Sequence, residues 1–167
     1  MKKDGMVIPE EGFSEINQVL DDLLERSSSE CAFLVDKSGQ LISMRGNMEK
    51  VDSAAFASLS AGNFAATSEL AKLIGEEEFS VLFHEGETES IHISIVARNI
   101  IMVIVFRTDE TSLGLVRLEM KKSIKELVEL FKTLNEKSKD EKGQKQFDDS
   151  FTKSLDDEID NLFKDNG

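Results

Sequence analysis

The sequence predicts an α+β sandwich, in which a five-stranded, mainly antiparallel sheet carries helices on both faces. Helical periodicity stands at both ends of residues 10–136, and one further helical segment divides the strand-like segments between them into a pair and a trio. The expected order is therefore αββαβββα. In the most economical arrangement the first and last helices cover one face of the sheet, and the middle helix covers the other.

The first two elements are a helix and a β-hairpin. After Pro9, apolar residues recur every three or four positions as far as the polar run "RSSSE", at Phe13, Ile16, Leu20, Leu23 and Leu24. The segments "CAFLVD" and "QLISMRG" then flank "DKSG", in which Asp36 and Gly39 suit a type I turn. This spacing predicts two antiparallel strands joined by that turn.

The middle helix has two apolar surfaces. Asp52 is expected to cap a helix that runs to Ile74, with Gly75 ending it. One face carries Phe56, Leu59, Ala66, Leu70 and Leu73, and a second surface carries only small side chains, namely Ala57, Ala61, Gly62, Ala65 and Ser68. Glycine inside a helix costs about 1 kcal/mol relative to alanine, which suggests close approach by another element. Periodicity leaves open whether that element is a second helix or the chain's own sheet.

Three strands and a closing helix complete the pattern. Segment 79–84 alternates Phe79, Val81 and Phe83, "SIHISIVA" alternates its isoleucines, and "NIIMVIVF" is apolar throughout. Thr111 or Ser112 is expected to cap the closing helix, whose apolar positions reach Leu134.

Charge and composition narrow the function. The 167 residues carry a formal charge of −13, which disfavours nucleic acid and anionic lipid as partners. Cys31 is the only cysteine, the first residues lack the apolar region of a secretory signal, and the longest apolar run is too short to span a bilayer. A cytoplasmic protein that binds other proteins is therefore expected.

The sequence offers little catalytic chemistry. It lacks the GxxxxGK[ST] pattern of a phosphate-binding loop, and His84 and His92 lie in neighbouring predicted strands without a cysteine cluster. Cys31 opens a strand, where a half-buried, inert thiol is the common outcome. We expect no catalytic residue, metal site or cofactor, and hence a protein that is not an enzyme.

Several stretches resemble the Roadblock / dynein light-chain family. They are "FLVDKSGQLIS" (33–43), "LSAGNFAATSELAKLIGEEEF" (59–79), "FHEG" (83–86) and "TSLGLVRLEMKK" (111–122), and within the family they are most similar to MglB-type bacterial polarity regulators. The tail "DDEIDNLF" (156–163) also resembles that group. The similarity covers Phe13 to about Phe131, plus the tail, and it implies a Roadblock-like sandwich.

The resemblance implies a homodimer that regulates a Ras-like small GTPase of the MglA type in cell polarity or motility. The third strand and middle helix would meet their copies across a two-fold axis, through Ala57, Phe79, Val81, Leu82 and Phe83. Strand pairing would also protect an exposed sheet edge, from which Leu82 is expected to face outward. The GTPase contact would be Ala61, Ala65, Ser68, Glu69 and Lys72. Cytoplasmic localisation is implied, with enrichment at a cell pole allowed.

Two mechanisms could stimulate GTP hydrolysis. An inserted arginine finger is one route, but none of the five arginines lies on the middle helix. The resemblance favours the other, in which the dimer presses on the switch segments so that the GTPase's own residues become catalytic. An effect on nucleotide exchange is also allowed.

The chain is expected to divide into four parts. These are a flexible N-terminus (1–9), the Roadblock-like domain (10–136), a disordered charged linker (137–152) and an amphipathic C-terminal docking helix (153–164). The docking helix carries an apolar stripe of Leu155, Ile159, Leu162 and Phe163. The resemblance implies that this stripe binds a second surface of the GTPase, and the alternative is a helix that folds back on its own domain.

Two other functional classes remain open. A Roadblock adaptor or scaffold would bind a GTPase or a larger assembly without changing nucleotide turnover. A sensor would bind a small ligand within the sandwich and would be stabilised thermally by metabolites.

Overall fold

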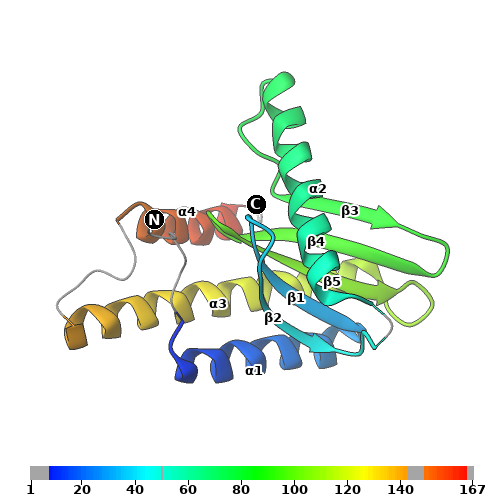
Figure 1. Ribbon diagram of the computed structural model, residues 1–167. Helices are drawn as coiled ribbons and strands as arrows, with labels where there is room; N and C mark the ends of the chain where they lie inside the picture. Colours follow the sequence, from blue (N-terminus) through cyan, green and yellow to red (C-terminus); the bar gives the residue numbers. More distant parts are fainter. Residues whose placement is uncertain (1–7, 50, 143–148, 165–167) are drawn as a thin grey trace.

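The structure is a computed structural model that describes residues 8–49, 51–142 and 149–164, with side chains described for residues 8–49, 51–137 and 153–162. Four helices and five strands form one α+β unit (Figure 1). In chain order they are α1 (Glu10–Ser27), β1 (Cys31–Asp36), β2 (Leu41–Gly46), α2 (Ser53–Leu73), β3 (Val81–Glu85), β4 (Glu89–Ala97), β5 (Ile100–Arg107), α3 (Leu113–Lys142) and α4 (Asp149–Lys164).

The sheet has the strand order β2-β1-β5-β4-β3, and every neighbouring pair is antiparallel. The apolar strand β5 lies at the centre, where Met102 pairs with Leu34 on one side and Ser94 on the other. Because β2 and β3 each have one neighbour, they are the two edges of the sheet. The predicted α+β class and sheet are confirmed.

Two apolar layers hold the sandwich together. On one face α1 and α3 pack against Leu34, Met102 and Ile104. On the other face α2 packs against Phe33, Ile101 and Val103. Adjacent residues of the central strands alternate between these layers, as a pleated sheet requires. The predicted division of the helices between the two faces is therefore confirmed (Figure 1).

The predicted caps and turn form as expected. The Asp52 carboxylate accepts a hydrogen bond from the Ala55 backbone N–H at 3.1 Å. The Ser112 hydroxyl accepts one from the Leu115 N–H at 3.2 Å, which selects Ser112 over Thr111. In the hairpin turn the Gly39 N–H donates to the Asp36 carbonyl at 2.8 Å. Gly39 has φ +98°, a conformation that glycine adopts without strain.

Three boundaries differ from the expectation. Strand β3 begins at Val81, so Phe79 precedes the strand instead of opening it. Helix α3 continues to Lys142, and α4 begins at Asp149, so both helices extend into the segment expected to be a disordered linker. The polar residues after Leu134 carry mixed charges that suit a solvated helix as well as a linker.

The C-terminal half of α2 rises beyond the sheet (Figure 1). In this part of the helix Leu70 and Leu73 are exposed, whereas Ala71 is buried. Among the described residues, no helix is long and apolar enough to cross a membrane.

Candidate protein-interaction surface

Part of the small-residue surface of α2 faces the chain's own sheet, while Gly62 and Ala65 of that surface are exposed. Ala57, Ala61 and Phe64 are buried there, and Ala71 continues the same face. Lys37 Nζ lies 5.0 Å from the centre of the Phe64 ring and makes a cation–π contact with it. Small side chains at these positions let the helix backbone approach the sheet closely. For Ala57 and Ala61 the approaching element is thus the chain's own sheet, whereas a side chain at Gly62 would meet open space among the described residues.

This packing corrects two predicted site residues. Ala57 is fully buried and Ala61 is 4% exposed, so neither offers surface to another protein in this structure. Ala57 was expected at a dimer interface and Ala61 at a GTPase contact. Both expectations came from the family resemblance.

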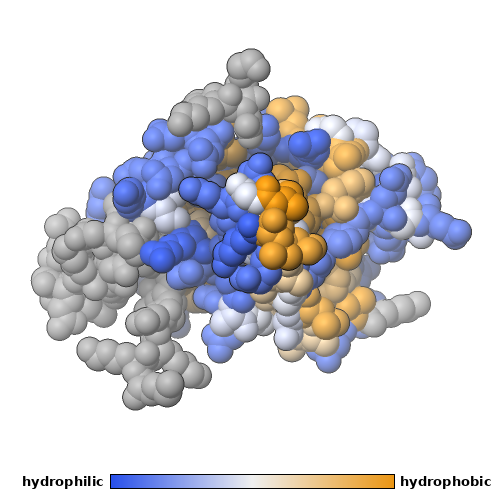
Figure 2. All heavy atoms as spheres, turned by 90° about the horizontal axis from the view of Figure 1, so that it is seen from above, coloured by the Kyte–Doolittle hydropathy of each residue, from blue (hydrophilic) through white to orange (hydrophobic). Residues whose placement is uncertain are grey.

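The opposite side of α2 carries a leucine stripe, which we define as Leu59, Leu70, Leu73 and Ile74. Leu73 is 82% exposed and Leu59 is 74% exposed. Seen from above, apolar side chains form a patch near the centre of the view (orange in Figure 2). A cluster of large exposed aliphatic side chains is uncommon on a monomeric protein and marks an interaction surface.

Strand β3 adds an unpaired edge beside this helix. Asn63 Nδ2 lies 2.8 Å from His84 Nε2, which connects α2 to β3 directly. Val81 and Phe83 are each more than one-third exposed. Leu82 was expected to face outward, but it packs on the apolar layer under α2, because side chains alternate along the strand. The outward apolar side chains are therefore Val81 and Phe83.

The remaining predicted GTPase contacts lie on the flank of α2. Ala65, Glu69 and Lys72 are exposed, and Lys72 Nζ lies 2.9 Å from Glu69 Oε1. Ser68 is half-buried, and its hydroxyl donates to the Phe64 carbonyl at 3.1 Å. The exposed part of the predicted contact is thus one small side chain beside an ion pair that can rearrange in solvent.

No arginine lies on α2, and three arginines are held by carboxylates elsewhere. Arg45 makes two hydrogen bonds to Asp21, and Arg107 makes two to Asp109. Arg26 Nε lies 3.2 Å from Glu119 Oε2. Each of these guanidinium groups has a carboxylate partner within its own chain.

The C-terminal helix docks on its own domain. Leu155 is completely buried, and Ile159 and Leu162 pack on the same apolar layer, against α3 and β4. Lys132 on α3 forms an ion pair with Asp156. The stripe is therefore covered within the chain, which is the fold-back alternative. The side chain of Phe163, the fourth predicted member, lies outside the described residues.

The described residues offer neither a reactive thiol nor a metal-binding group. Cys31 is fully buried, and burial, with Glu30 and Glu89 nearby, raises the pKa of its thiol to about 12. Such a thiol is inert toward oxidation and nucleophilic chemistry at neutral pH. Within the described ranges, no group of His, Cys, Asp and Glu side chains has an arrangement that could hold a metal ion.

The fold agrees with comparisons to known proteins. Residues 15–106 match the Roadblock/LC7 domain. The chain belongs to the Roadblock/LC7 family. This Roadblock protein is of the MglB type, since it is 48% identical to Myxococcus xanthus MglB over 77% of this chain and 96% of that one, with a TM-score of 0.72.

Two further solved structures are similar to this Roadblock protein. One, described as MglB with a tetrameric arrangement, is 25% identical over 80% of this chain and 99% of that one, with a TM-score of 0.73. The other, the gliding protein MglB from Thermus thermophilus, is 26% identical over 79% of this chain and 99% of that one, with a TM-score of 0.71. Among curated proteins, none matches the chain.

Proposed function

We propose that this chain is a homodimeric regulator of an MglA-type Ras-like GTPase, which stimulates GTP hydrolysis in bacterial cell polarity or motility. The observation that carries the proposal is the exposed leucine stripe of α2 beside the open β3 edge, in a chain of the MglB type. The protein acts in the cytoplasm in this account, with a cell pole as its site of enrichment.

The dimer uses the stripe and the edge together. Pairing of β3 with its copy satisfies the unpaired backbone groups of the edge, and it brings the two α2 helices alongside each other. Burying a large aliphatic side chain contributes about 1.5–3 kcal/mol, so covering the stripe supplies a substantial part of the association energy. The tetrameric arrangement described for one MglB supports self-association of this chain.

The flank of α2 that carries Ala65, Glu69 and Lys72 then forms the GTPase platform, with Ser68 at its margin. A small residue in the middle of a contact lets a partner approach closely. Replacing Ala65 by arginine introduces bulk and charge without touching the leucine stripe. We expect Ala65→Arg to abolish binding of the MglA-type GTPase from the same organism while sedimentation still shows a dimer. Normal GTPase binding by the variant would contradict this platform.

In the proposed mechanism the GTPase's own residues perform the catalysis. The carboxylate-paired positions of Arg26, Arg45 and Arg107 support this mechanism, because a finger needs a guanidinium group free to reach the nucleotide. Changing each of the five arginines to alanine, one at a time, tests the mechanism. A single change that abolished stimulation while binding survived would establish the finger instead.

In this account the apolar stripe of α4 binds a second surface of the GTPase, with an effect on nucleotide exchange. Because Leu155 is buried within the chain, α4 must first leave its own domain. An adaptor that binds the GTPase without altering turnover is the second candidate, and it is favoured by the same exposed surface. Tight binding with unchanged hydrolysis and exchange rates would select it.

A further inference from the structure

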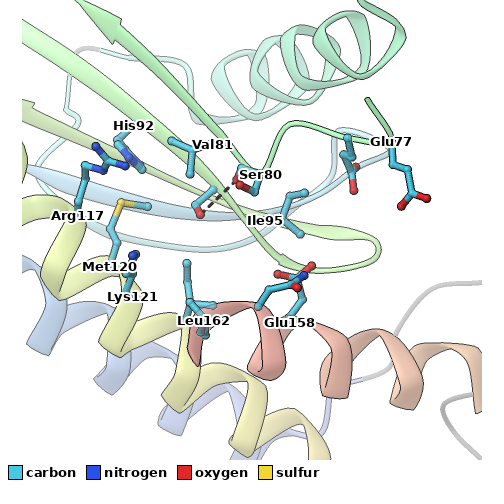
Figure 3. A pocket seen from close by; sticks show the side chains of 14 residues that line it. Glu77, Ser80, Val81, His92, Ile95, Arg117, Met120, Lys121, Glu158 and Leu162 are labelled. Atoms are coloured by element: carbon cyan, nitrogen blue, oxygen red, sulfur yellow. Dashed lines mark hydrogen bonds between the residues drawn. The ribbon is translucent and has the colours of Figure 1, made fainter. Parts of the chain in front are cut away.

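A polar cavity lies on the face of the sheet opposite α2. It has a volume of about 620 Å³ and is open to solvent on one side, where Arg117 and Glu77 are exposed. The segment before β3 lines it together with β3, β4, α3 and α4 (Figure 3). This volume falls within the range of small-molecule sites in proteins. This cavity has no role in the proposed function, which uses the leucine stripe, the β3 edge and the GTPase platform.

The cavity contains a buried histidine with unused hydrogen-bonding groups. His92 is 3% exposed, and neither of its ring nitrogens has a hydrogen-bond partner among the described residues. Burial, with Arg117 nearby, lowers the pKa of His92 to about 4, so the ring is neutral at physiological pH. A neutral imidazole offers one N–H donor and one acceptor. Buried polar groups are almost always satisfied, so an unsatisfied ring lining a cavity points to a missing partner.

Cations lie at the same end of the cavity. Arg117 and Lys121 are one turn apart on α3 and both line it. Neither forms an ion pair within the described part of the chain, although the chain has 33 acidic residues against 20 basic ones. Arg117 lies near His92 in the close view (Figure 3). This end is therefore suited to a carboxylate, which a guanidinium group and an N–H donor bind well.

Carboxylates lie at the other end. Glu77, Glu78 and Glu158 line it, and Glu77 and Glu158 lie well away from His92 and Arg117 in the same view (Figure 3). Lys37 pairs with Glu78 at 2.9 Å, which leaves an excess of negative charge. Burial and the charge of Glu78 raise the pKa of Glu158 to about 7, and the charge of Lys37 only partly offsets this rise. This end is suited to an amine.

We propose that this cavity binds a small dipolar metabolite of the amino-acid class, with its carboxylate beside Arg117 and Lys121 and its amine beside Glu158. The neutral ring of His92 donates to the carboxylate, and Ser80 and Ser94 also line the site. Because Glu158 lies on α4, the bound ligand holds that helix against the domain. Binding of the small molecule therefore competes with binding of α4 to the GTPase.

Nuclear magnetic resonance of the full-length chain tests the site. The imidazole ¹⁵N signals are followed during titration with glycine, β-alanine, γ-aminobutyrate and ε-aminocaproate, and with butyrate and butylamine as single-charge probes. We expect a saturable shift of His92 but not of His84, and binding of at least one dipolar probe about tenfold or more tighter than either single-charge probe. Absence of saturable binding for every dipolar probe, or equal binding of butyrate, would overturn the proposal.

Variants at the two ends make the test specific. Arg117→Gln with Lys121→Gln, and separately Glu158→Gln, should each weaken binding about tenfold or more. Lys122→Gln, a neighbouring α3 position outside the cavity, should leave it unchanged. Bound probe should also slow amide exchange in residues 153–162. Unchanged affinity in both end variants, or unchanged exchange in these residues, would contradict the assigned orientation. Neither result depends on whether the chain regulates a GTPase.

Discussion

At the scale of single residues, the direction in which a side chain leaves its helix decides whether it is buried or can contact a partner. Ala61 and Ala65 are identical, lie one turn apart on α2 and look equivalent in the sequence. The structure buries Ala61 against the sheet and exposes Ala65. Helical spacing could show that small residues share a surface, but it could not show which way that surface faces.

The matched pair gives a direct test of this orientation. Ala61→Leu should lower the free energy of unfolding by about 1–3 kcal/mol, because the extra atoms overpack the layer beneath α2. Ala65→Leu should change it by no more than about 0.5 kcal/mol. Urea denaturation of both variants measures the difference. Equal effects at the two positions would mean that α2 is rotated relative to the sheet.

His92 gives the stability a specific pH dependence. Its pKa is about 4 in the folded chain and 6.5 in an unfolded one, so between these values the unfolded state binds more protons. The free energy of unfolding should therefore fall as pH drops from 6.5 to 4, by roughly 3 kcal/mol at most. In His92→Leu this part of the slope should vanish in urea titrations across the window. A variant with the wild-type slope would refute the assignment.

At the scale of elements, α2 is apolar on two sides and can be covered by the domain on only one. The sequence showed both surfaces, but the large residues Leu59, Leu70 and Leu73 were expected to share one apolar face with the partly buried Phe56. Leu59 is exposed because it lies on the side of α2 opposite its buried face. Leu70 and Leu73 lie in the C-terminal half of α2, which extends beyond the sheet (Figure 1). A helix that is apolar on both sides is itself the signal for a second partner.

Charge in the leucine stripe should disrupt self-association. Leu70→Glu with Leu73→Glu places two carboxylates where the proposed dimer buries aliphatic groups, so the dissociation constant should rise about 100-fold or more. Sedimentation velocity measures it. Leu118→Glu, at a 51% exposed position on α3, is the matched control and should remain dimeric. A dimer that survived the double change would place the interface elsewhere.

Helix α4 should dock in a pH-dependent way. The pKa of Glu158 is raised to about 7 in the docked helix, so docking retains a proton that the released helix loses. Docking is therefore favoured below pH 7 and weakens as pH rises through it, a trend that Lys37 opposes and that Glu78 and Asp157 support. Amide exchange in residues 153–162, corrected for intrinsic rates, should show this trend. It should disappear in Glu158→Gln and persist in the exposed control Asp160→Asn.

At the scale of the whole molecule, the order αββαβββα and the two-layer packing followed from local patterns. The turn at Asp36–Gly39 and the caps at Asp52 and Ser112 could be predicted because each depends on a hydrogen bond between residues close in the sequence. The sequence left the docking of α4 as an alternative and could not give the residues of the cavity beneath it, because these come from β3, β4, α3 and α4.

The central claim is that this Roadblock protein stimulates a GTPase. The most direct measurement is GTP hydrolysis by the MglA-type GTPase of the same organism, with and without the full-length chain and with a version truncated after Lys145. We expect the full-length chain to raise the hydrolysis rate by about tenfold or more, with a smaller effect after truncation. An unchanged rate in the presence of bound full-length protein would contradict the claim and leave a scaffold.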